Sequence, residues 1–192
     1  MHTLIFATNN DHKIKEIQSL VGKDFNIITL KQAGIDIDIP EPHDTLQENA
    51  TEKAVTIQQL TSENCFSEDT GLEIDALNGE PGVKSARYAG DERNFQSNID
   101  KVLEKLKGNS NRKAQFRTVI CLLWNKESFY FEGICEGTIS EKMHGEEGFG
   151  YDPIFIPTGA SKSFAEMTMA EKNQFSHRQK AVTKLFTFLH SI

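Results

Sequence analysis

The chain has few cysteines, and they do not form pairs. Cys65, Cys121 and Cys135 are the three cysteines, none of them belongs to a CxxC pair, and each lies within an apolar run. An odd number of cysteines without paired spacing argues against a disulfide framework. We therefore predict that all three are reduced thiols in the core of the fold.

An excess of basic residues is also lacking, because the formal net charge is −7. A protein that grips a nucleic acid polymer usually has a basic face, since neutralising phosphates supplies most of the affinity. A long nucleic acid is therefore not the expected partner. A small phosphate ligand remains possible, because a few local cations and a metal ion would be enough to hold it.

Long hydrophobic runs, repeats and low-complexity linkers are absent as well. The apolar stretch at residues 3–7 is far too short for a signal peptide or a membrane span. We therefore expect no membrane partner and a cytoplasmic location. No composition shift divides residues 1–192, so we expect a single domain.

What the chain does contain is an alternation of strand and helix patterns. Strands are expected at 3–7 and 25–30, with a helix between them that stops at Gly22. A further helix is expected to begin at Asp44 as N-cap, with Gln47 at the spacing of a capping box. Helical spacing places Leu46, Ala50, Ala54 (or Lys53) and Ile57 on one apolar face of this helix. This mixture predicts an α/β fold with a mixed sheet.

The second half of the chain is richer in strand patterns. Residues 64–77 look like two strand pieces joined at "EDTG". Two long β-rich runs, 113–124 and 128–140, flank "NKE" and predict an antiparallel hairpin. Amphipathic spacing predicts helices within 94–108 and 176–192.

The stretch "TNNDHK" (8–13) links an expected strand to an expected helix. Such a turn offers backbone N–H groups and the positive end of the helix dipole to an anion. Asn9 and Asn10 could add amide donors, and Lys13 lies one turn into the helix. Without GxxxxGK[ST] this is not a P-loop, and a turn of this kind taken alone is more often an ordinary helix cap.

Three acidic residues and one lysine could supply a metal and phosphate site. Glu68 and Asp69 follow apolar "CF" at an apparent strand end, and Glu41 lies in the proline-flanked "PEP". Carboxylate oxygens suit Mg²⁺, which often takes one or two of them together with substrate phosphates. Lys53 lies in the expected helix "ENATEKA". Taken singly, such residues are usually solvated surface groups.

Two later stretches could meet a nucleoside. In "GFGYDP" (148–153), glycines would let the backbone approach a ligand closely, and an aromatic ring could stack on a base. A tight turn packed by its own aromatic residues would explain the same pattern. In "SHR" (176–178), Ser176 could cap the last helix, while the histidine and arginine could donate to carbonyl oxygens.

Taken in order, these stretches resemble one family. The chain contains "TNNDHK", "ENATEKA", "EDTGLEIDALNGEPGVKSARYAG", "GFGYDP" and "EKNQFSHR" at roughly the spacings of the inosine triphosphate pyrophosphatases, also called HAM1-like or non-standard purine nucleoside triphosphate pyrophosphatases. The resemblance covers nearly the whole chain. Three positions depart mildly, since Asn9 stands where glycine is commoner, Glu68 where aspartate is, and Thr70 where serine is.

The resemblance implies an enzyme that hydrolyses inosine, deoxyinosine and xanthosine triphosphates to the monophosphate and pyrophosphate, and so cleanses the nucleotide pool. It also implies a requirement for Mg²⁺ and assembly as a homodimer. The implied fold is a single α/β domain over 1–192, in which a long mixed sheet and two lobes flank a deep nucleotide-binding cleft.

Residue roles follow from the same resemblance. Asp69 would be the catalytic acid–base group, and Glu41 and Asp69 would serve the metal. The residues implied for the triphosphate are Thr8, Asn9, Asn10, Asp11, His12, Lys13 and Lys53. The residues implied around the nucleoside are Thr70, Phe149, Gly150, Tyr151, Asp152, Lys172, His177 and Arg178. Lys84 and Arg87 receive no definite role.

The chemistry of the implied reaction agrees with these residue types. When water attacks phosphorus, protein groups mainly position the reactants and neutralise charge. Lys13 and Lys53 would balance the phosphates, and Asp69 would accept the water proton. Lys172, His177 or Arg178 would donate to the oxygen at position 6 of the base, where adenine has an amino group instead.

Two other functions remain open at this point. A Maf-like pyrophosphatase would act on pyrimidine or modified nucleotides, although "SHR" and "GFGYDP" argue against it. A nucleotide-binding regulator without catalysis is the alternative from a different class, although Lys13, Lys53 and Asp69 argue against that. A panel of nucleoside triphosphates separates all three.

Overall fold

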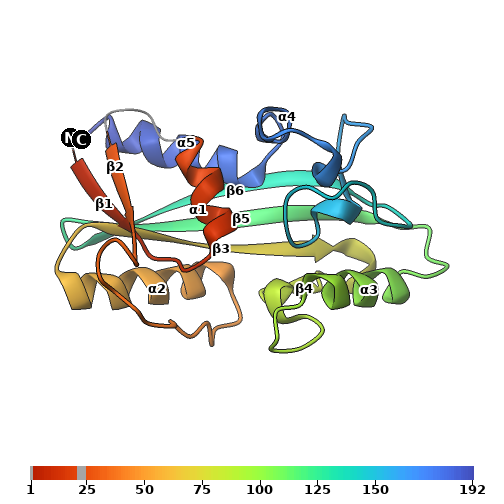
Figure 1. Cartoon of the computed structure of the whole chain (residues 1–192), viewed down its shortest axis with the longest axis horizontal. Helices are drawn as coiled ribbons and strands as arrows, with labels where there is room; N and C mark the ends of the chain where they lie inside the picture. The colour runs from red at the N-terminus through yellow and green to blue at the C-terminus, as the bar shows by residue number, and fades with distance from the viewer. Residues whose placement is uncertain (1, 21–24) are drawn as a thin grey trace. The chain divides into compact units, whose positions relative to one another are not determined.

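The computed structural model describes residues 2–20 and 25–192 and contains one mixed sheet (Figure 1). Along this sheet the strand order is β2-β1-β3-β5-β6-β7, and β4 pairs with β3 off this path. β1 is parallel to both β2 and β3, whereas β4 is antiparallel to β3 and β7 to β6. The strands are β1 His2–Phe6, β2 Phe25–Thr29, β3 Cys65–Ile74, β4 Pro81–Gly82, β5 Lys113–Trp124, β6 Glu127–Ile139 and β7 Phe155–Pro157.

Five α-helices accompany the sheet within the described residues: α1 Asp11–Gln18, α2 Leu46–Thr61, α3 Phe95–Lys105, α4 Met169–Asn173 and α5 His177–Leu189. The expected helices therefore form close to where the apolar spacing placed them. The predicted stop of the first helix at Gly22 lies outside the described residues. The structure ends that helix at Gln18, with Ser19 as its C-cap.

The predicted N-cap of α2 was wrong by one residue. Thr45, not Asp44, caps the helix: its Oγ1 accepts from the Glu48 backbone N–H at 3.1 Å and donates to the Glu48 carboxylate at 2.7 Å. Thr45 has the extended backbone (φ −124°, ψ 147°) that an N-cap requires. Asp44 with Gln47 and Thr45 with Glu48 both have the spacing of a capping box, and the structure uses the second pair.

The expected break in the strand at "EDTG" was also wrong, because β3 runs without interruption from Cys65 to Ile74. Its first residues pair with β1, whereas Leu72 and Glu73 pair with β4. At Gly71 a Cβ atom would lie only 2.7 Å from the carbonyl oxygen of Gly82. The glycine therefore permits the close approach of β4 rather than ending the strand.

The predicted hairpin is confirmed. β5 and β6 are neighbours in the sheet, and only Asn125 and Lys126 separate them. Both residues have positive φ, 50° and 71°, as a two-residue hairpin turn of the primed type requires.

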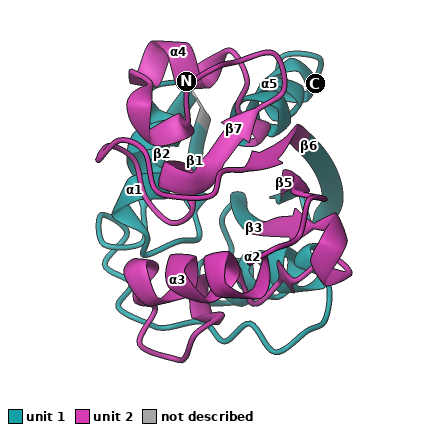
Figure 2. Cartoon of the chain, turned by 90° about the vertical axis from the view of Figure 1, so that its right-hand side faces the viewer, with its two compact units in different colours: residues 1–69, 118–133, 178–192 teal, residues 70–117, 134–177 magenta. Residues whose placement is uncertain are grey.

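The described chain separates into two compact units, which Figure 2 colours teal and magenta. Unit 1 comprises residues 1–69, 118–133 and 178–192, and unit 2 comprises residues 70–117 and 134–177. β3, β5 and β6 each contribute residues to both units. The single domain and the deep cleft expected from the resemblance stay predictions.

Unit 1 buries side chains on both faces of its strands. Leu4 and Phe6 of β1 pack in a cluster with α1 and α5, whereas Ile5 and Ala7 pack in a cluster with α2. Successive side chains of a strand point to opposite faces, so this alternation seats helices on both sides of the sheet (Figure 1). The face of α2 predicted to be apolar is buried at Leu46, Ala50, Ala54 and Ile57.

Unit 2 has a core of its own, which contains Leu72 from β3, Ile99 and Val102 from α3, and Phe155 from β7. The three cysteines are free and buried, which confirms the prediction of core thiols. Within the described residues, no helix combines the length and apolarity that spanning a bilayer requires.

Candidate functional site

The turn between β1 and α1 is built by its own side chains. Asn10 is the N-cap, and its Oδ1 accepts from the backbone N–H groups of His12 and Lys13 at 3.0 and 3.1 Å. Thr8 Oγ1 accepts from the Asn10 N–H at 3.2 Å, and Asn9 Nδ2 donates to the Ile37 carbonyl at 2.7 Å. This bonding fixes the helix N-terminus, and its positive dipole end marks a place suited to an anion.

Glu68 of β3 is fully buried and held by cations. Arg178 of α5 donates to both of its oxygens, from Nε to Oε2 at 2.8 Å and from Nη2 to Oε1 at 3.0 Å. Lys13 Nζ lies 3.1 Å from Oε1. Burial alone would raise the pKa of Glu68, but Arg178 and Lys13 outweigh it and lower that pKa to about 2.

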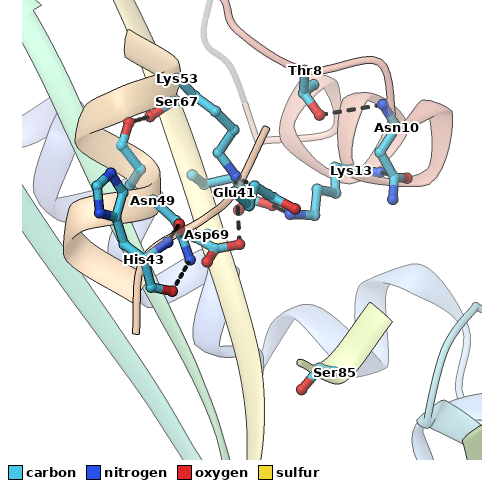
Figure 3. Close-up of polar contacts among 12 residues, drawn as sticks. Thr8, Asn10, Lys13, Glu41, His43, Asn49, Lys53, Ser67, Asp69 and Ser85 are labelled. Atoms are coloured by element: carbon cyan, nitrogen blue, oxygen red, sulfur yellow. Dashed lines mark hydrogen bonds and ion pairs between the residues drawn. The ribbon is translucent and has the colours of Figure 1, made fainter. Parts of the chain in front are cut away.

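Lys53 of α2 lies between two carboxylates (Figure 3). Its Nζ lies 2.5 Å from Glu41 Oε1 and 3.4 Å from Asp69 Oδ1. Burial by itself would lower the pKa of this lysine, but Asp69 and Glu41 more than compensate, so the pKa is raised. Lys53 is therefore a permanently charged group at the centre of an acidic cluster.

Asp69 is buried at 6% exposure. Burial raises its pKa above the ordinary value, and the neighbouring Glu41 adds to the rise, whereas Lys53 and Lys13 offset only part of it. Within the described part of the chain, its Oδ2 atom has no hydrogen-bond partner. A buried carboxylate oxygen that lacks a partner is costly, so this oxygen is suited to bind a cation or to accept a proton.

These carboxylates fit a hard divalent cation. Among the described residues, no cluster of three or more His, Cys, Asp or Glu side chains forms a complete metal cage. Mg²⁺ does not need one, because it is usually bound through one or two carboxylates together with waters and substrate phosphates. Glu41 and the Asp69 Oδ2 atom provide two such oxygens, and the ammonium of Lys53 shows that this position already favours positive charge.

A second group of predicted residues lies in unit 2 and centres on Asp152. Its Oδ2 accepts from Lys172 Nζ at 2.7 Å and from the Phe149 N–H at 2.9 Å. The Lys172 ammonium also lies over the rings of Phe149 and Phe164, 5.4 and 5.2 Å from their centroids. The loop "GFGYDP" is thus folded around one buried ion pair.

The other nucleoside candidates of unit 2 have separate contacts. The ring of His177 stacks on Phe116 with centroids 4.7 Å apart, and the Tyr151 hydroxyl donates to the Ser85 carbonyl at 2.8 Å. Thr70 is half-buried and follows Asp69 directly along β3.

Arg178 lies in unit 1, although the sequence places it beside His177. It is 1% exposed, and besides Glu68 it pairs through Nη1 with Glu16 of α1. A guanidinium held by two buried carboxylates has few donors left for a base. The predicted set therefore divides: unit 1 holds 8–13, Glu41, Lys53, Asp69 and Arg178, and unit 2 holds Thr70, 149–152, Lys172 and His177.

Sequence reasoning missed Glu16. It is 4% exposed although it is charged. The signal was present in the helical spacing, because Lys13 and Glu16 stand three residues apart and so share a face of α1. The sequence did not reveal the ion-pair partner of Glu16, because Arg178 lies 162 residues further along the chain.

The comparisons with known proteins agree with one another. The model of the Ham1 family matches residues 4–188. The chain is 50% identical over 190 residues to the dITP/XTP pyrophosphatase of Porphyromonas gingivalis, covering 98% of each, and 48% identical over 186 residues to that of Flavobacterium johnsoniae, covering 97% of each.

Solved structures show the same relationship. The Ham1 protein of Coxiella burnetii superposes with a TM-score of 0.91 at 36% identity over 100% of both chains, and that of Staphylococcus aureus with 0.89 at 37% identity over 98% of both. The chain therefore belongs to the Ham1 family, and its α/β fold with one mixed sheet is the fold of that family.

Proposed function

We propose that this protein is a nucleoside triphosphate pyrophosphatase that hydrolyses inosine, deoxyinosine and xanthosine triphosphates to the monophosphate and pyrophosphate. Its relatives from Porphyromonas and Flavobacterium carry the name dITP/XTP pyrophosphatase. The observation that carries the proposal is Asp69, a buried carboxylate with an open oxygen beside Lys53 and Glu41. Removing non-canonical purines from the nucleotide pool is the corresponding role.

The triphosphate is assigned to unit 1. Lys13 and Lys53 provide positive charge, and the capped N-terminus of α1, with 8–13 around it, provides the positive end of a helix dipole. Hydrolysis of a phosphoric anhydride depends mainly on such positioning and neutralisation. Lys53 is now paired with Glu41 and Asp69, and we propose that substrate phosphates compete for it.

Mg²⁺ is the proposed cofactor, held by Glu41 and Asp69. When bound, it would neutralise charge on the phosphate oxygens and favour ionisation of water next to it. Lys13 and Lys53 already face the three carboxylates of Glu68, Glu41 and Asp69, so the site has no excess of positive charge, and a substrate with several negative charges needs this additional cation.

Asp69 is proposed to accept the proton of the attacking water. Because its pKa is raised, the ionised carboxylate is a better base than that of an ordinary aspartate.

The nucleoside is assigned to unit 2. Lys172 and His177 are proposed to donate to the oxygen at position 6 of hypoxanthine or xanthine, with Thr70 and 149–152 around the nucleoside. Adenine has an amino group at position 6, which would face these donors without forming a hydrogen bond. A site built to hydrogen-bond one group strongly rejects a ligand that lacks it. For Arg178 we propose an indirect role, in which it holds Glu68 beside Asp69.

The proposed setting is the cytoplasm, and the proposed assembly is a homodimer. The homodimer proposal rests on the family resemblance. The three buried free thiols are consistent with a reducing compartment.

The test is release of pyrophosphate from inosine, xanthosine, adenosine and pyrimidine triphosphates, each with and without Mg²⁺. Fast hydrolysis of the first two and slow hydrolysis of the others would support the proposal. Preference for a pyrimidine would instead favour a Maf-like activity. Tight binding of inosine triphosphate without any turnover would identify a nucleotide-binding regulator.

A further inference from the structure

Glu41 lies on a segment that has little backbone bonding available. Residues 35–42 contain no helix or strand, and Pro40 and Pro42 flank the glutamate on both sides. Proline has no N–H group, so the first amide after Glu41 that can donate a hydrogen bond is that of His43. An irregular loop of this kind does not by itself hold a carboxylate in one place.

Asn9 holds this segment at Ile37, and Asn49 attaches the chain just after Glu41 (Figure 3). Its Oδ1 accepts from the His43 N–H at 2.9 Å, and its Nδ2 donates to the His43 carbonyl at 3.1 Å. The side chain is 1% exposed and lies on α2. One buried amide therefore occupies both backbone groups of His43, the residue two positions beyond Glu41.

The same helix face carries the other parts of the acidic cluster. Lys53 stands one turn after Asn49 and pairs with Glu41 at 2.5 Å. Between them, the Ala50 carbonyl accepts a hydrogen bond from Ser67, which lies two residues before Asp69 on β3. α2 is thus joined to the Glu41 loop on one side and to the strand of Asp69 on the other.

We propose that Asn49 is a positioning residue that holds Glu41 against Lys53 and Asp69, and thereby sets the affinity of the site for its divalent metal. This inference rests on the proposed function, because it takes Glu41 as a metal ligand. Residues that orient metal ligands typically change metal affinity by 10- to 100-fold when they are lost.

Unit 2 provides a matched control. Asn98 of α3 makes a comparable clamp, since its Oδ1 accepts from the Ala89 N–H at 2.7 Å and its Nδ2 donates to the Ala86 carbonyl at 3.1 Å. It is buried to a similar degree, at 2% exposure. Asn98→Leu therefore removes these two hydrogen bonds, together with a longer one from Nδ2 to the Ser85 carbonyl at 3.4 Å, without touching the loop of Glu41.

The experiment compares Asn49→Leu, Asn98→Leu and Glu41→Gln with the wild type, and Asn49→Ser replaces Asn49→Leu if the latter does not fold. Binding of Mn²⁺ to the protein is followed by electron paramagnetic resonance, and the Mg²⁺ concentration for half-maximal pyrophosphate release is measured at fixed inosine triphosphate. We expect the Asn49 variant to bind Mn²⁺ more weakly by about 10-fold or more, and to need a Mg²⁺ concentration that is higher by about the same factor. Glu41→Gln should change both quantities in the same direction. Asn98→Leu should leave both unchanged.

Hydrogen exchange checks the proposed cause, because the His43 amide should lose protection in the Asn49 variant. Equal metal dependence in the Asn49 variant and the wild type would overturn the inference while Glu41→Gln still confirmed the metal site. If Asn98→Leu changed the metal dependence as much as the Asn49 variant does, the change would reflect a general loss of stability, and this would also overturn the inference. Undiminished hydrolysis by the wild type in excess chelator would be a different failure, that of the proposed metal function itself.

Discussion

Asp69 and Glu68 are adjacent on β3, are both buried, and have pKa values shifted in opposite directions. Glu68 lies beside Arg178 and Lys13, which lower its pKa, whereas burial dominates at Asp69 and raises its pKa. Two carboxylates whose pKa values are pushed apart can take different roles. Glu68 is suited to remain charged and hold cations, and Asp69 is suited to exchange a proton.

Asp69→Asn should remove catalysis without disrupting the fold. The amide cannot accept the water proton and binds a divalent cation more weakly. We expect kcat for inosine triphosphate to fall at least ~100-fold, the low end of general base catalysis, with an unchanged circular dichroism spectrum. Turnover near the wild-type rate in the folded variant would remove Asp69 from the role assigned to it.

The raised pKa of Asp69 also predicts an effect on stability. Because this pKa is higher in the folded protein than in the unfolded chain, ionising Asp69 costs stability. The cost is absent below the unfolded value of 3.8 and is complete above the folded-state pKa. In chelator at pH 7, urea unfolding should therefore find Asp69→Asn at least as stable as the wild type, an advantage that disappears in acid. Loss of stability in the variant at pH 7 would contradict this.

Arg178→Ala distinguishes an indirect role from base reading. The substitution would remove the guanidinium that both buried carboxylates, Glu68 and Glu16, contact, and breaking a buried ion pair in this way typically costs about 3–5 kcal/mol. We expect a marked drop in Tm and an equal fall in kcat/KM for inosine and adenosine triphosphates. A fall confined to inosine triphosphate, so that the two rates converge, would assign Arg178 to the base instead.

At the scale of elements, the loop before β7 depends on glycine at one position. Gly148 has φ +77°, and a Cβ atom there would lie 2.1 Å from Asp152 Oδ2. Gly159, which lies outside the proposed nucleoside residues, also has positive φ, +89°, but a Cβ there would meet no atom within 4 Å. Both glycines have a backbone conformation that other residues rarely adopt, but only Gly148 is also needed to leave room for the Asp152 carboxylate, which pairs with Lys172.

Gly148→Ala should therefore disturb the proposed nucleoside residues, whereas Gly159→Ala should not. Both variants incur the cost of a left-handed alanine, ~1 kcal/mol, but only the first displaces the Asp152 carboxylate. Loss of its charge-assisted hydrogen bond, about 1.5–3 kcal/mol, should lower kcat/KM for inosine triphosphate roughly 10-fold or more. Steady-state kinetics of both variants, with Tm as a control, tests this, and equal kinetics in the two would contradict it.

Across the whole molecule, one buried network joins segments that are remote in sequence. Lys13 and Glu16 of α1, Glu68 of β3 and Arg178 of α5 meet through ion pairs. Breaking a buried pair leaves an uncompensated charge, so this network makes the packing of unit 1 sensitive to pH.

Acid should unfold the protein partly through Glu68. Its pKa is about 2 when folded and 4.5 ordinarily, so its stabilisation is complete above pH 4.5 and is lost as pH falls toward 2. The contribution is on the order of 3 kcal/mol. Urea unfolding between pH 7 and 3 should show stability that falls with pH in the wild type and falls less in Glu68→Gln. Glu146 is exposed, so Glu146→Gln serves as the control and should behave like the wild type. If stability fell equally steeply with pH in the wild type and in Glu68→Gln, Glu68 would not be the cause of the acid sensitivity.

Sequence alone determined most of the elements and the residues of interest. The spacing of Leu46, Ala50, Ala54 and Ile57 predicted the buried face of α2, because helical periodicity is a local property. The turn before α1 and the hairpin were likewise readable, since caps and turns are chosen by neighbouring residues. Quoted motifs, taken together, also indicated the family.

Tertiary structure decided what those residues contact. The continuity of β3 past Gly71 depends on β4 lying against it. Arg178 pairs with Glu16 and Glu68, although 162 and 110 residues separate it from them. The raised pKa of Asp69 depends on burial and on charges from other elements. Contacts and electric fields of this kind exist only once packing brings distant segments together, which is why no local pattern could reveal them.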